Sequence, residues 1–334
     1  MNASYQAPPH PQAGSRKPAI AVLIPCYNEE IAIGAVVRDF RGALPEAAVY
    51  VYDNNSTDRT KEVAAVAGAI CRHEPLQGKG NVVRRMFADV EADVYILVDG
   101  DATYDAASAR RMILPVLRDC VDMVNGIRRA SAQGAYRAGH RFGNSLLTAI
   151  VTLLFGSQIT DVLSGYRAMS RRFVKSFPAL SRGFEIETEL TIHALELRLP
   201  IAEIETPYKE RPAGSFSKLS TYRDGFRILR VITVLMKEER PLQFLGAISI
   251  AIFLVAIGLA LPLFWTYVET GLVPRFPTAV LVSGLSIVSL LTFFSGLILD
   301  TVTRGRRENK RMRYLEFPCK IFDVPSTSDV HLQN

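Results

Sequence analysis

The stretch Asp93-Val94-Tyr95-Ile96-Leu97-Val98-Asp99-Gly100-Asp101 decides the fold. Residues 93–98 are mostly apolar and rich in β-branched and aromatic side chains, which predicts a buried strand. Open α/β sheets bind ligands at the carboxyl ends of their strands, so we expect Asp99 and Asp101 to lie at a ligand. Two carboxylates this close repel each other unless a cation lies between them, and Mg²⁺ prefers a few carboxylates together with phosphate oxygens. The alternative is a solvated Asp-Gly-Asp turn without a ligand.

Strands and helices are expected to alternate on both sides of this stretch. The expected strands cover residues 19–24, 48–52, 69–72, 121–126 and 201–204, and a short strand follows the turn at 161–167. The expected helices cover residues 31–40, 61–67, 81–90 and 106–119, and another begins in the acidic stretch 184–189. This alternation, with polar loops after the strands, predicts an α/β fold with a doubly wound, mostly parallel sheet.

Three earlier polar loops, after the first, second and third strands, are expected at the same edge of the sheet as Asp99. Asp53 ends the second strand, where an acidic side chain can hydrogen-bond a ribose or a base; the alternative is that it only caps the following helix. Lys79 lies between two glycines, so its ammonium group and the backbone can approach a phosphate together. The spacing of a Walker loop is absent and no Gly-x-Gly-x-x-Gly follows the first strand, so the sequence disfavours a dinucleotide cofactor.

Two runs without a charged side chain, residues 241–268 and 276–299, change the character of the chain. Each is long enough to cross roughly 30 Å of membrane hydrocarbon as a helix. The following segment 304–313 is strongly basic, so the positive-inside rule predicts a multi-pass inner-membrane protein with both termini in the cytoplasm. The expected parts are a flexible tail 1–18, a cytoplasmic domain 19–220, an amphipathic juxtamembrane helix 221–240, a two-helix anchor 241–302 and a basic tail 303–334.

Composition bears on compartment and partners. The four cysteines, Cys26, Cys71, Cys120 and Cys319, show no paired spacing, which fits a reducing compartment and no metal cage. The net charge is +6, and the basic residues concentrate beside the membrane segments instead of on a soluble patch, so nucleic acid is not an expected partner.

Several charged side chains are expected to have structural roles. Arg167 and the acidic row Glu185, Glu187 and Glu189 are expected to form structural ion pairs. His73 is expected to pack or to lie at the surface. No Ser-His-Asp or Cys-His set for nucleophilic catalysis is evident in the sequence.

Five motifs in a fixed order give the chain a family resemblance. They are Ile24-Pro-Cys-Tyr-Asn-Glu-Glu30, Tyr52-Asp-Asn-Asn-Ser-Thr-Asp58, Asp99-Gly-Asp101, Asp161-x-x-Ser-Gly-Tyr-Arg167 and Arg211…Gly214…Ser217-Lys218. Over about residues 19–220 the chain resembles family 2 glycosyltransferases. Within that family it resembles the polyprenyl-phosphate hexosyltransferases, such as dolichol-phosphate mannose synthase and bactoprenol glucosyltransferases. The resemblance implies a GT-A-type, Rossmann-like fold, and the two-helix anchor is similar to the bactoprenol branch, which implies a homo-tetramer.

The resemblance also implies a role for each matching residue. The nucleotide-sugar donor would be bound by Pro25, Tyr27, Glu29, Val51, Asp53, Lys79, Asp99, Gly100, Asp101, Arg128, Arg211 and Lys218. Asp99 and Asp101 would hold Mg²⁺ or Mn²⁺ on the donor diphosphate. The phosphate of the lipid acceptor would be bound by Arg128, Arg141 and Ser145. The implied catalytic group comprises Asp161, a carboxylate that orients the sugar or the acceptor or, secondarily, removes a proton, together with Asp101, Arg211 and Lys218.

Three departures from the family pattern leave details open. Asn54 replaces a second Asp, which leaves the base preference open. Thr103 replaces the metal-binding Gln of mannose synthases, so that ligand is in doubt. The loop from Arg211 to Lys218 is one residue longer than the common spacing.

The expected reaction is a single inverting transfer of a hexose from a nucleotide sugar, first UDP-glucose and second GDP-mannose, to a polyprenyl phosphate. A lipid phosphate has a second pKa of about 6, so it needs positioning more than a strong base. One alternative is a membrane glycosyltransferase whose acceptor is a lipid hydroxyl; it would need a real general base and would make Asp161 indispensable. The other is a non-catalytic nucleotide-sugar-binding scaffold.

Overall fold

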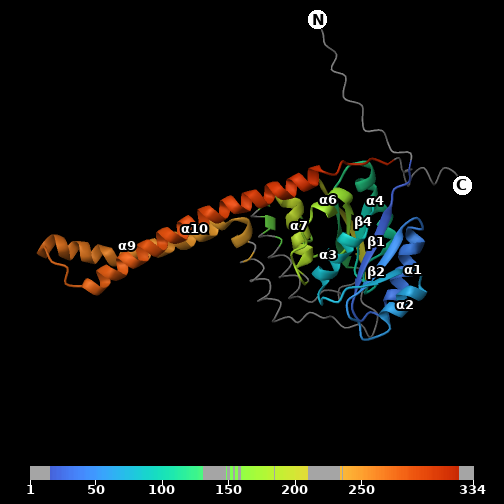
Figure 1. Ribbon diagram of the computed structural model, residues 1–334, viewed down its shortest axis with the longest axis horizontal. Coiled ribbons are helices and arrows are strands. Elements are labelled where there is room, and N and C mark those ends of the chain that lie inside the picture. The colour runs from blue at the N-terminus through green and yellow to red at the C-terminus, as the bar shows by residue number, and fades with distance from the viewer. Residues whose placement is uncertain are drawn as a thin grey trace, which may run out of the picture. The chain divides into compact units, whose positions relative to one another are not determined.

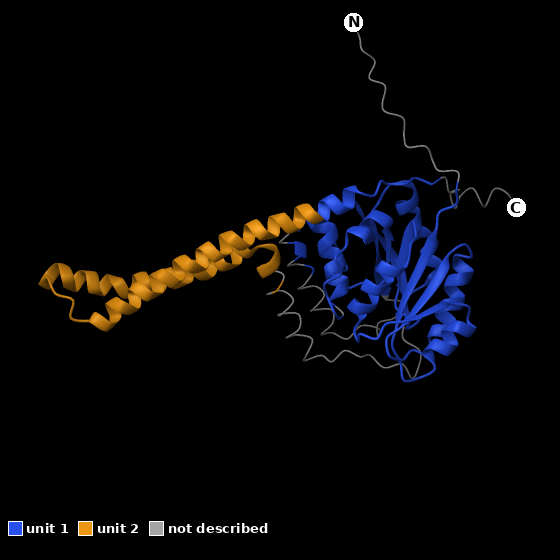
Figure 2. Cartoon of the chain, viewed as in Figure 1, with its two compact units in different colours: residues 1–224, 310–334 blue, residues 225–309 orange. Residues whose placement is uncertain are grey.

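The computed structural model describes residues 16–130, 148, 151–152, 155–156, 159–183, 185–209, 234 and 236–322. The chain divides into two compact units, residues 1–224 with 310–334 and residues 225–309 (Figure 2). Arg141, Ser145, Arg211 and Lys218 lie outside the described residues, as do almost all of the expected N-terminal tail and most of the expected juxtamembrane helix.

The first unit is built on a seven-stranded sheet in the order β3-β2-β1-β4-β6-β5-β7. Its strands are β1 (Ile20–Cys26), β2 (Ala48–Asp53), β3 (Ile70–His73), β4 (Val94–Leu97), β5 (Met123–Ala130), β6 (Arg167–Ser170) and β7 (Ile201–Tyr208). Only β6 is antiparallel to its neighbours β4 and β5, while the other paired strands are parallel. The prediction of a mostly parallel α/β sheet is confirmed.

Helices cover both faces of this sheet (Figure 1). They are α1 (Ile33–Ala43), α2 (Thr60–Val66), α3 (Lys79–Asp89), α4 (Ala109–Arg118), α6 (Arg171–Ser176) and α7 (Ile186–Glu196), and a 3₁₀ turn at Ala106–Ser108 precedes α4. The core forms two layers: Val22 and Ile24 of β1 belong to the cluster with α1 and α4, whereas Ala21 and Leu23 belong to the cluster with α3, α6 and α7. A strand buried on both faces explains why β1 is a continuous apolar run.

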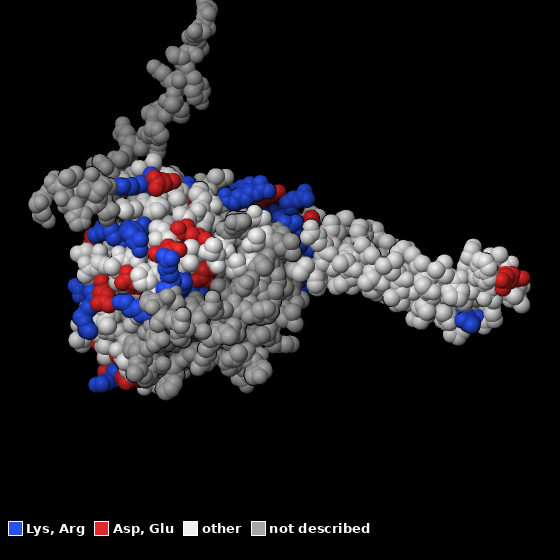
Figure 3. Space-filling view, turned by 180° about the vertical axis from the view of Figure 1, so that it is seen from behind, with Lys and Arg blue, Asp and Glu red and all other residues white. Residues whose placement is uncertain are grey.

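The second unit contains most of two long helices, α9 (Pro241–Thr270) and α10 (Phe276–Leu315). Both are long and apolar enough to cross a membrane. Figure 3 shows their uncharged surface, with charges at the loop that joins them. Ser249 and Ser289 bridge the helices, since the Ser249 hydroxyl donates to the Ser289 carbonyl at 2.8 Å and the reverse bond measures 2.9 Å. Beyond the apolar run, α10 continues as a helix through the basic segment 304–313.

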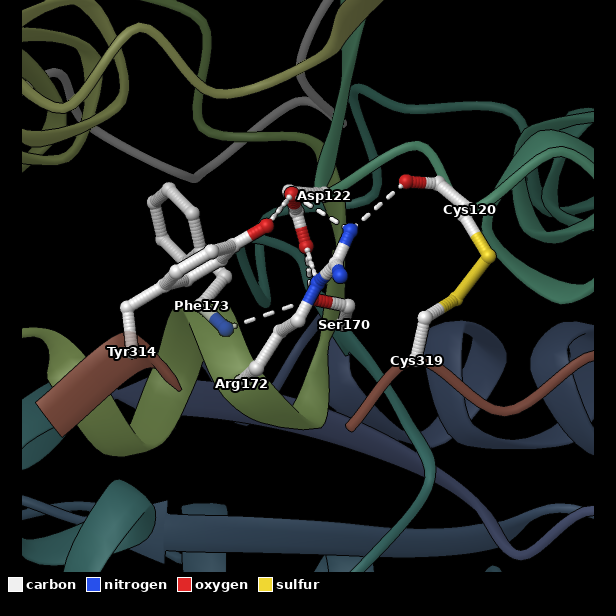
Figure 4. Close-up of a disulfide and its surroundings, with 7 residues drawn as sticks. All are labelled: Cys120, Asp122, Ser170, Arg172, Phe173, Tyr314 and Cys319. Atoms are coloured by element: carbon white, nitrogen blue, oxygen red, sulfur yellow. Dashed lines mark hydrogen bonds and ion pairs between the residues drawn. A yellow bond between two sulfur atoms is a disulfide. The ribbon is translucent and has the colours of Figure 1, made fainter. Parts of the chain in front are cut away.

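The expectation that the cysteines stay unpaired is wrong for two of them. Cys120 and Cys319 form a disulfide across a sequence separation of 199 residues (Figure 4), whereas Cys26 and Cys71 are free thiols. Sequence spacing gives no sign of this pair because the two cysteines meet only after the chain has passed through both long helices. The bond fastens residues 310–322, which we call the return segment and which belong to the first unit, to the connection between α4 and β5.

The return segment also makes buried polar contacts with the rest of the first unit. Asp122 is fully buried and accepts hydrogen bonds from the Arg172 guanidinium and, at 2.8 Å, from the Tyr314 hydroxyl (Figure 4). Phe322 enters the core, and its amide donates to the Leu117 carbonyl. These residues therefore belong to the packed structure of the sheet domain, although the sequence reads as a basic tail.

Candidate active site

The polar loops meet at one edge of the sheet because the strands before them run in the same direction. Asp53 is the last residue of β2, and Asp99 follows β4 by two residues. Arg128 lies near the end of β5, which runs parallel to β4 because both pair antiparallel to β6. The partly exposed Pro25, Tyr27 and Glu29 end or follow β1.

The side chain of Asn54 ties two of these loops together. Its amide nitrogen donates to the carbonyls of Glu74 and Leu76, each at 2.8 Å, and its amide oxygen accepts from the Gly78 amide at 2.7 Å. A carboxylate could not donate these two bonds. The Asn at this position therefore has a structural reason in this chain.

Asp53 is buried at the start of the same loop. Its carboxylate accepts a hydrogen bond from the Ser56 amide at 3.3 Å and lies 3.5 Å from Nδ1 of His73. His73 therefore contacts a predicted site residue, whereas the sequence suggested only a packing or surface role. Val51, two residues earlier in β2, is fully buried in the core. Its side chain therefore supports this edge from inside the fold.

The glycines around Lys79 allow the loop before α7 to approach closely. A Cβ on Gly78 or Gly80 would lie 2.1 Å from the carbonyl oxygen of Arg182 or Ser181, and Gly78 has φ +129°. The Gly80 amide donates to the Arg182 carbonyl at 3.1 Å. The sequence Gly-Lys-Gly is thus required by backbone packing as well as by any phosphate.

Lys79 lies between two carboxylates. Its ammonium group is 2.5 Å from Oδ1 of Asp99 and 2.5 Å from Oε1 of Glu187. Burial lowers the pKa of Lys79, but the two carboxylates outweigh this effect and the net shift is upward. Burial raises the pKa of Glu187. Glu187 does form an ion pair, as expected, but it does so inside the site instead of at a structural position.

Asp101 is held by the residue two positions later. Its Oδ1 accepts from the Thr103 hydroxyl at 2.6 Å and from the Thr103 amide at 3.2 Å. Among the described residues no three His, Cys, Asp or Glu side chains converge to form a metal cage. The two carboxylates of Asp99 and Asp101 still fit a hard divalent cation, because Mg²⁺ and similar ions take one or two carboxylates and complete their shell with phosphate oxygens and water.

The Asp161–Arg167 motif packs directly against Asp99. A Cβ on Gly165 would lie 2.4 Å from Oδ2 of Asp99, so any larger residue there would displace the Asp99 carboxylate. The Gly165 amide donates to the Tyr104 hydroxyl at 2.9 Å. Burial raises the pKa of this Tyr104 hydroxyl, so it stays neutral at physiological pH.

The same motif carries a buried ion pair. The Arg128 guanidinium donates from Nε to Oδ2 and from Nη2 to Oδ1 of Asp161, both at 2.7 Å. Arg128 also lies over the ring of Tyr208, with its central carbon 5.8 Å from the ring centroid. This bidentate geometry fixes the direction of both charged groups.

Within the part of the chain that the structure describes, Arg167 does not form the ion pair that the sequence suggests. It is fully buried, and its guanidinium donates to the carbonyls of Ser164 at 3.0 Å and Val162 at 2.8 Å. Burial lowers its pKa to about 10, against the opposing effect of nearby carboxylates such as Glu187. Arg167 therefore stabilises the backbone of the Asp161–Arg167 motif through these hydrogen bonds.

The sequence reasoning missed Glu187, Tyr104 and Tyr208 as neighbours of the site. Of these three residues, only Glu187 could have been found from the sequence. It lies between the apolar residues Ile186 and Leu190, both of which are fully buried, so a helix over this stretch places Glu187 near its inward face. The two tyrosines meet through a bridge between distant segments and have no local signature.

Comparison with known proteins places this fold and its motifs in a family. Residues 21–177 match the family model described as glycosyl transferase family 2. The chain is 33% identical over 302 residues to glycosyltransferase AglJ of Haloferax volcanii, covering 89% of this chain and 98% of the relative. It is 30% identical over 221 residues to a dolichyl-phosphate hexose transferase of the same organism, covering 66% of this chain and 95% of that relative. Protein RfbJ of Shigella flexneri is 57% identical over 123 residues, which is 36% of this chain and 95% of RfbJ.

The fold is shared with a solved enzyme. Glucosyl-3-phosphoglycerate synthase of Mycobacterium tuberculosis, in complex with Mn²⁺, UDP and glucosyl-3-phosphoglycerate, superposes with a TM-score of 0.55 and 23% identity, covering 66% of this chain and 79% of that one. This likeness supports the GT-A fold. With the match to AglJ over most of both chains, it leads to one conclusion: the chain belongs to glycosyl transferase family 2 and is a glycosyltransferase.

Proposed function

We propose that the chain transfers one hexose from a nucleotide sugar to a polyprenyl phosphate at the cytoplasmic face of a membrane. UDP-glucose is the first donor to test and GDP-mannose the second. The similarity to a dolichyl-phosphate hexose transferase supports a lipid phosphate as acceptor. The two long apolar helices support a membrane location.

The ion pair between Arg128 and Asp161 is the observation that carries this proposal. Both oxygens of Asp161 accept hydrogen bonds from the same guanidinium, and the Asp161 side chain is only 6% exposed. A carboxylate held in this way is poorly placed to remove a proton from a lipid hydroxyl. A lipid phosphate, whose second pKa is about 6, is already largely ionised and needs no such base. The pair therefore favours a phosphate acceptor over a hydroxyl acceptor.

In the proposed reaction, a phosphate oxygen of the lipid attacks the anomeric carbon of the sugar. The bond from that carbon to the donor diphosphate breaks, so the sugar inverts and the nucleoside diphosphate leaves. Asp99 and Asp101 would hold a divalent metal, which would supply positive charge beside the leaving diphosphate. Arg128 directs positive charge toward the acceptor phosphate, and Asp161 fixes its guanidinium in that direction.

The remaining predicted donor and acceptor contacts complete the proposal. We assign the nucleoside to the edge formed by Pro25, Tyr27, Glu29 and Asp53, with Val51 behind it in the core. Arg211 and Lys218 close on the diphosphate, and Arg141 and Ser145 bind the acceptor phosphate. The basic end of α10 lies on the cytoplasmic side, and the enzyme assembles as a tetramer.

The test compares two acceptors that differ in one group. The purified protein in detergent is given UDP-glucose or GDP-mannose with either undecaprenyl phosphate or undecaprenol. We expect transfer to the phosphate only, and Asp161→Asn should retain part of that transfer because the Asn oxygen still accepts from Arg128. Transfer to undecaprenol that disappears in Asp161→Asn would instead identify Asp161 as a general base and the acceptor as a hydroxyl.

A further inference from the structure

Glu187 is a buried carboxylate that the proposed reaction leaves without a role. Its Oε1 accepts from the Lys79 ammonium, whereas its Oε2 is buried and has no hydrogen-bond partner among the described residues. The residue is 6% exposed. A buried anionic oxygen without a donor is strongly unfavourable, so this atom calls for a partner that the protein itself does not provide.

The backbone that carries Glu187 is fixed at the edge of the site. Glu187 stands in the first turn of α7. The loop before this turn is tied to the Gly78–Gly80 loop by the bond from the Gly80 amide to the Arg182 carbonyl. On its other side, the Glu189 carboxylate accepts from the amides of Leu180 and Ser181, each at 2.8 Å. Glu187 is therefore held in place before any ligand arrives.

The neighbours of Glu187 indicate which part of a donor it faces. Lys79 lies between Glu187 and Asp99, and Asp99 is 30% exposed, which makes it the open side of this cluster. If Asp99 and Asp101 hold the metal and diphosphate, the group next to them along a nucleotide sugar is the hexose. Glu187 and Asp99 contact the same Lys79 ammonium group, so under the proposed function Glu187 lies on the side of the metal and diphosphate where the hexose would follow.

The chemistry of a lone carboxylate oxygen selects among possible ligands. A diphosphate only accepts hydrogen bonds at its oxygens and would be repelled by the Glu187 charge. A second cation would be opposed by the Lys79 ammonium, which already contacts the same carboxylate. A sugar hydroxyl is neutral and donates a hydrogen bond, so it satisfies the oxygen without a charge conflict.

We propose that Oε2 of Glu187 accepts a hydrogen bond from a hydroxyl group of the donor hexose and so takes part in selecting the sugar. This inference rests on the proposed function for the position of the hexose. A site built to hydrogen-bond a hydroxyl rejects analogues that lack it, because the buried acceptor is then left unpaired. We therefore expect one hydroxyl of the hexose to contribute at least about tenfold to donor affinity through Glu187.

The test measures donor binding on the full-length protein in detergent, by calorimetry, with Mg²⁺ present. The probes are UDP-glucose and UDP, with GDP-mannose and GDP in parallel. For Glu187→Gln we expect the sugar nucleotide to bind at least tenfold more weakly and the nucleoside diphosphate to change less than threefold. Glu185→Gln, the same substitution at a partly exposed position two residues away, should change neither affinity.

Three outcomes of the binding experiment would overturn the proposal. Equal weakening of UDP and UDP-glucose would mean that Glu187 acts through Lys79 on the diphosphate. Unchanged affinities for all probes, or a wild-type protein that binds neither sugar nucleotide better than its nucleoside diphosphate, would mean that Glu187 makes no contact with sugar.

Monodeoxy analogues of the preferred donor give a second measurement that does not depend on how well the variant folds. In the wild type, removal of one particular hydroxyl should weaken binding at least tenfold, and Glu187→Gln should bind that analogue no more weakly than the wild type does. Equal losses in both proteins for every analogue would refute the contact. Because no lipid acceptor is needed, sugar discrimination that persists without transfer to polyprenyl phosphate would refute the proposed function and leave this inference standing.

Discussion

Gly165→Ala tests the role of Asp99 without changing any charged group. In the wild type, a Cβ at residue 165 would lie 2.4 Å from Oδ2 and 3.0 Å from Cγ of Asp99. Since Cβ atoms in proteins essentially never approach other atoms within 3.0 Å, Asp99 must move by about 0.6 Å or more. A displacement of about 1 Å at a catalytic group lowers activity by about 100-fold, so we expect kcat/KM to fall by one to two orders of magnitude.

The stability of Gly165→Ala should change much less than its activity. Asp99 is partly exposed and can turn toward solvent, so we expect overpacking at the low end of its range, about 1 kcal/mol. Gly42→Ala is the matched control, because a Cβ there meets nothing within 4 Å. As a glycine within helix α1, it should gain about 0.5–1 kcal/mol of stability on replacement and keep full activity. The assay pairs thermal unfolding with sugar transfer from the preferred donor. A folded Gly165→Ala protein with undiminished kcat/KM would refute the placement of Asp99 at the reaction centre.

Three further predictions concern the ion pair, a buried histidine and the disulfide. Arg128→Met should destabilise the protein by about 3 kcal/mol, because it removes the ion pair and both guanidinium hydrogen bonds that Arg128 gives to the buried Asp161 carboxylate. Arg128→Met with Asp161→Leu should recover most of that loss; chemical unfolding of the four proteins measures this, and additive losses would contradict it. Burial lowers the pKa of His193 to about 3, so the stability that depends on its neutral form is present above the unfolded pKa of 6.5 and is lost as the pH drops toward 3. Between pH 7 and pH 5 the unfolding free energy of the wild type should therefore fall by about 2 kcal/mol more than that of His193→Phe. Equal pH dependence of the two unfolding free energies would contradict this. Cys319→Ser should lower the unfolding free energy by about 2–4 kcal/mol, because the disulfide between Cys120 and Cys319 is lost. A reductant should lower the melting temperature of the wild type but not of this variant. Cys71→Ser removes a free thiol and should leave the unfolding free energy unchanged.

Much of the fold follows from local pattern. The apolar runs before Asp53 and Asp99 are strands because they are short, bounded by polar residues and buried on both faces, and their common direction brings the following loops to one edge. The antiparallel β6 could not be predicted in this way, since strand direction depends on how the chain returns and not on the four residues Arg167–Ser170 themselves.

The site was predictable where a motif ends a strand and unpredictable where helices approach from elsewhere. Asp99 and Asp101 stand in the loop after β4 and Lys79 at the start of α3, positions that the sequence pattern places at the sheet edge. Glu187 reaches Lys79 across 108 residues of sequence, and Cys319 reaches Cys120 across 199. Such contacts are fixed by tertiary packing, which residue spacing along the chain does not encode.

The most direct test of the account is transfer of labelled sugar to a lipid phosphate by the purified protein. The protein in detergent is incubated with undecaprenyl phosphate, radiolabelled UDP-glucose or GDP-mannose, and Mg²⁺ or Mn²⁺, with Asp101→Ala in parallel. The account predicts an acid-labile lipid-linked monosaccharide of inverted configuration that requires the metal and is lost in Asp101→Ala. Labelled nucleotide sugar that binds to the protein but never reaches the lipid phosphate, or a product that forms equally well in Asp101→Ala, would contradict it.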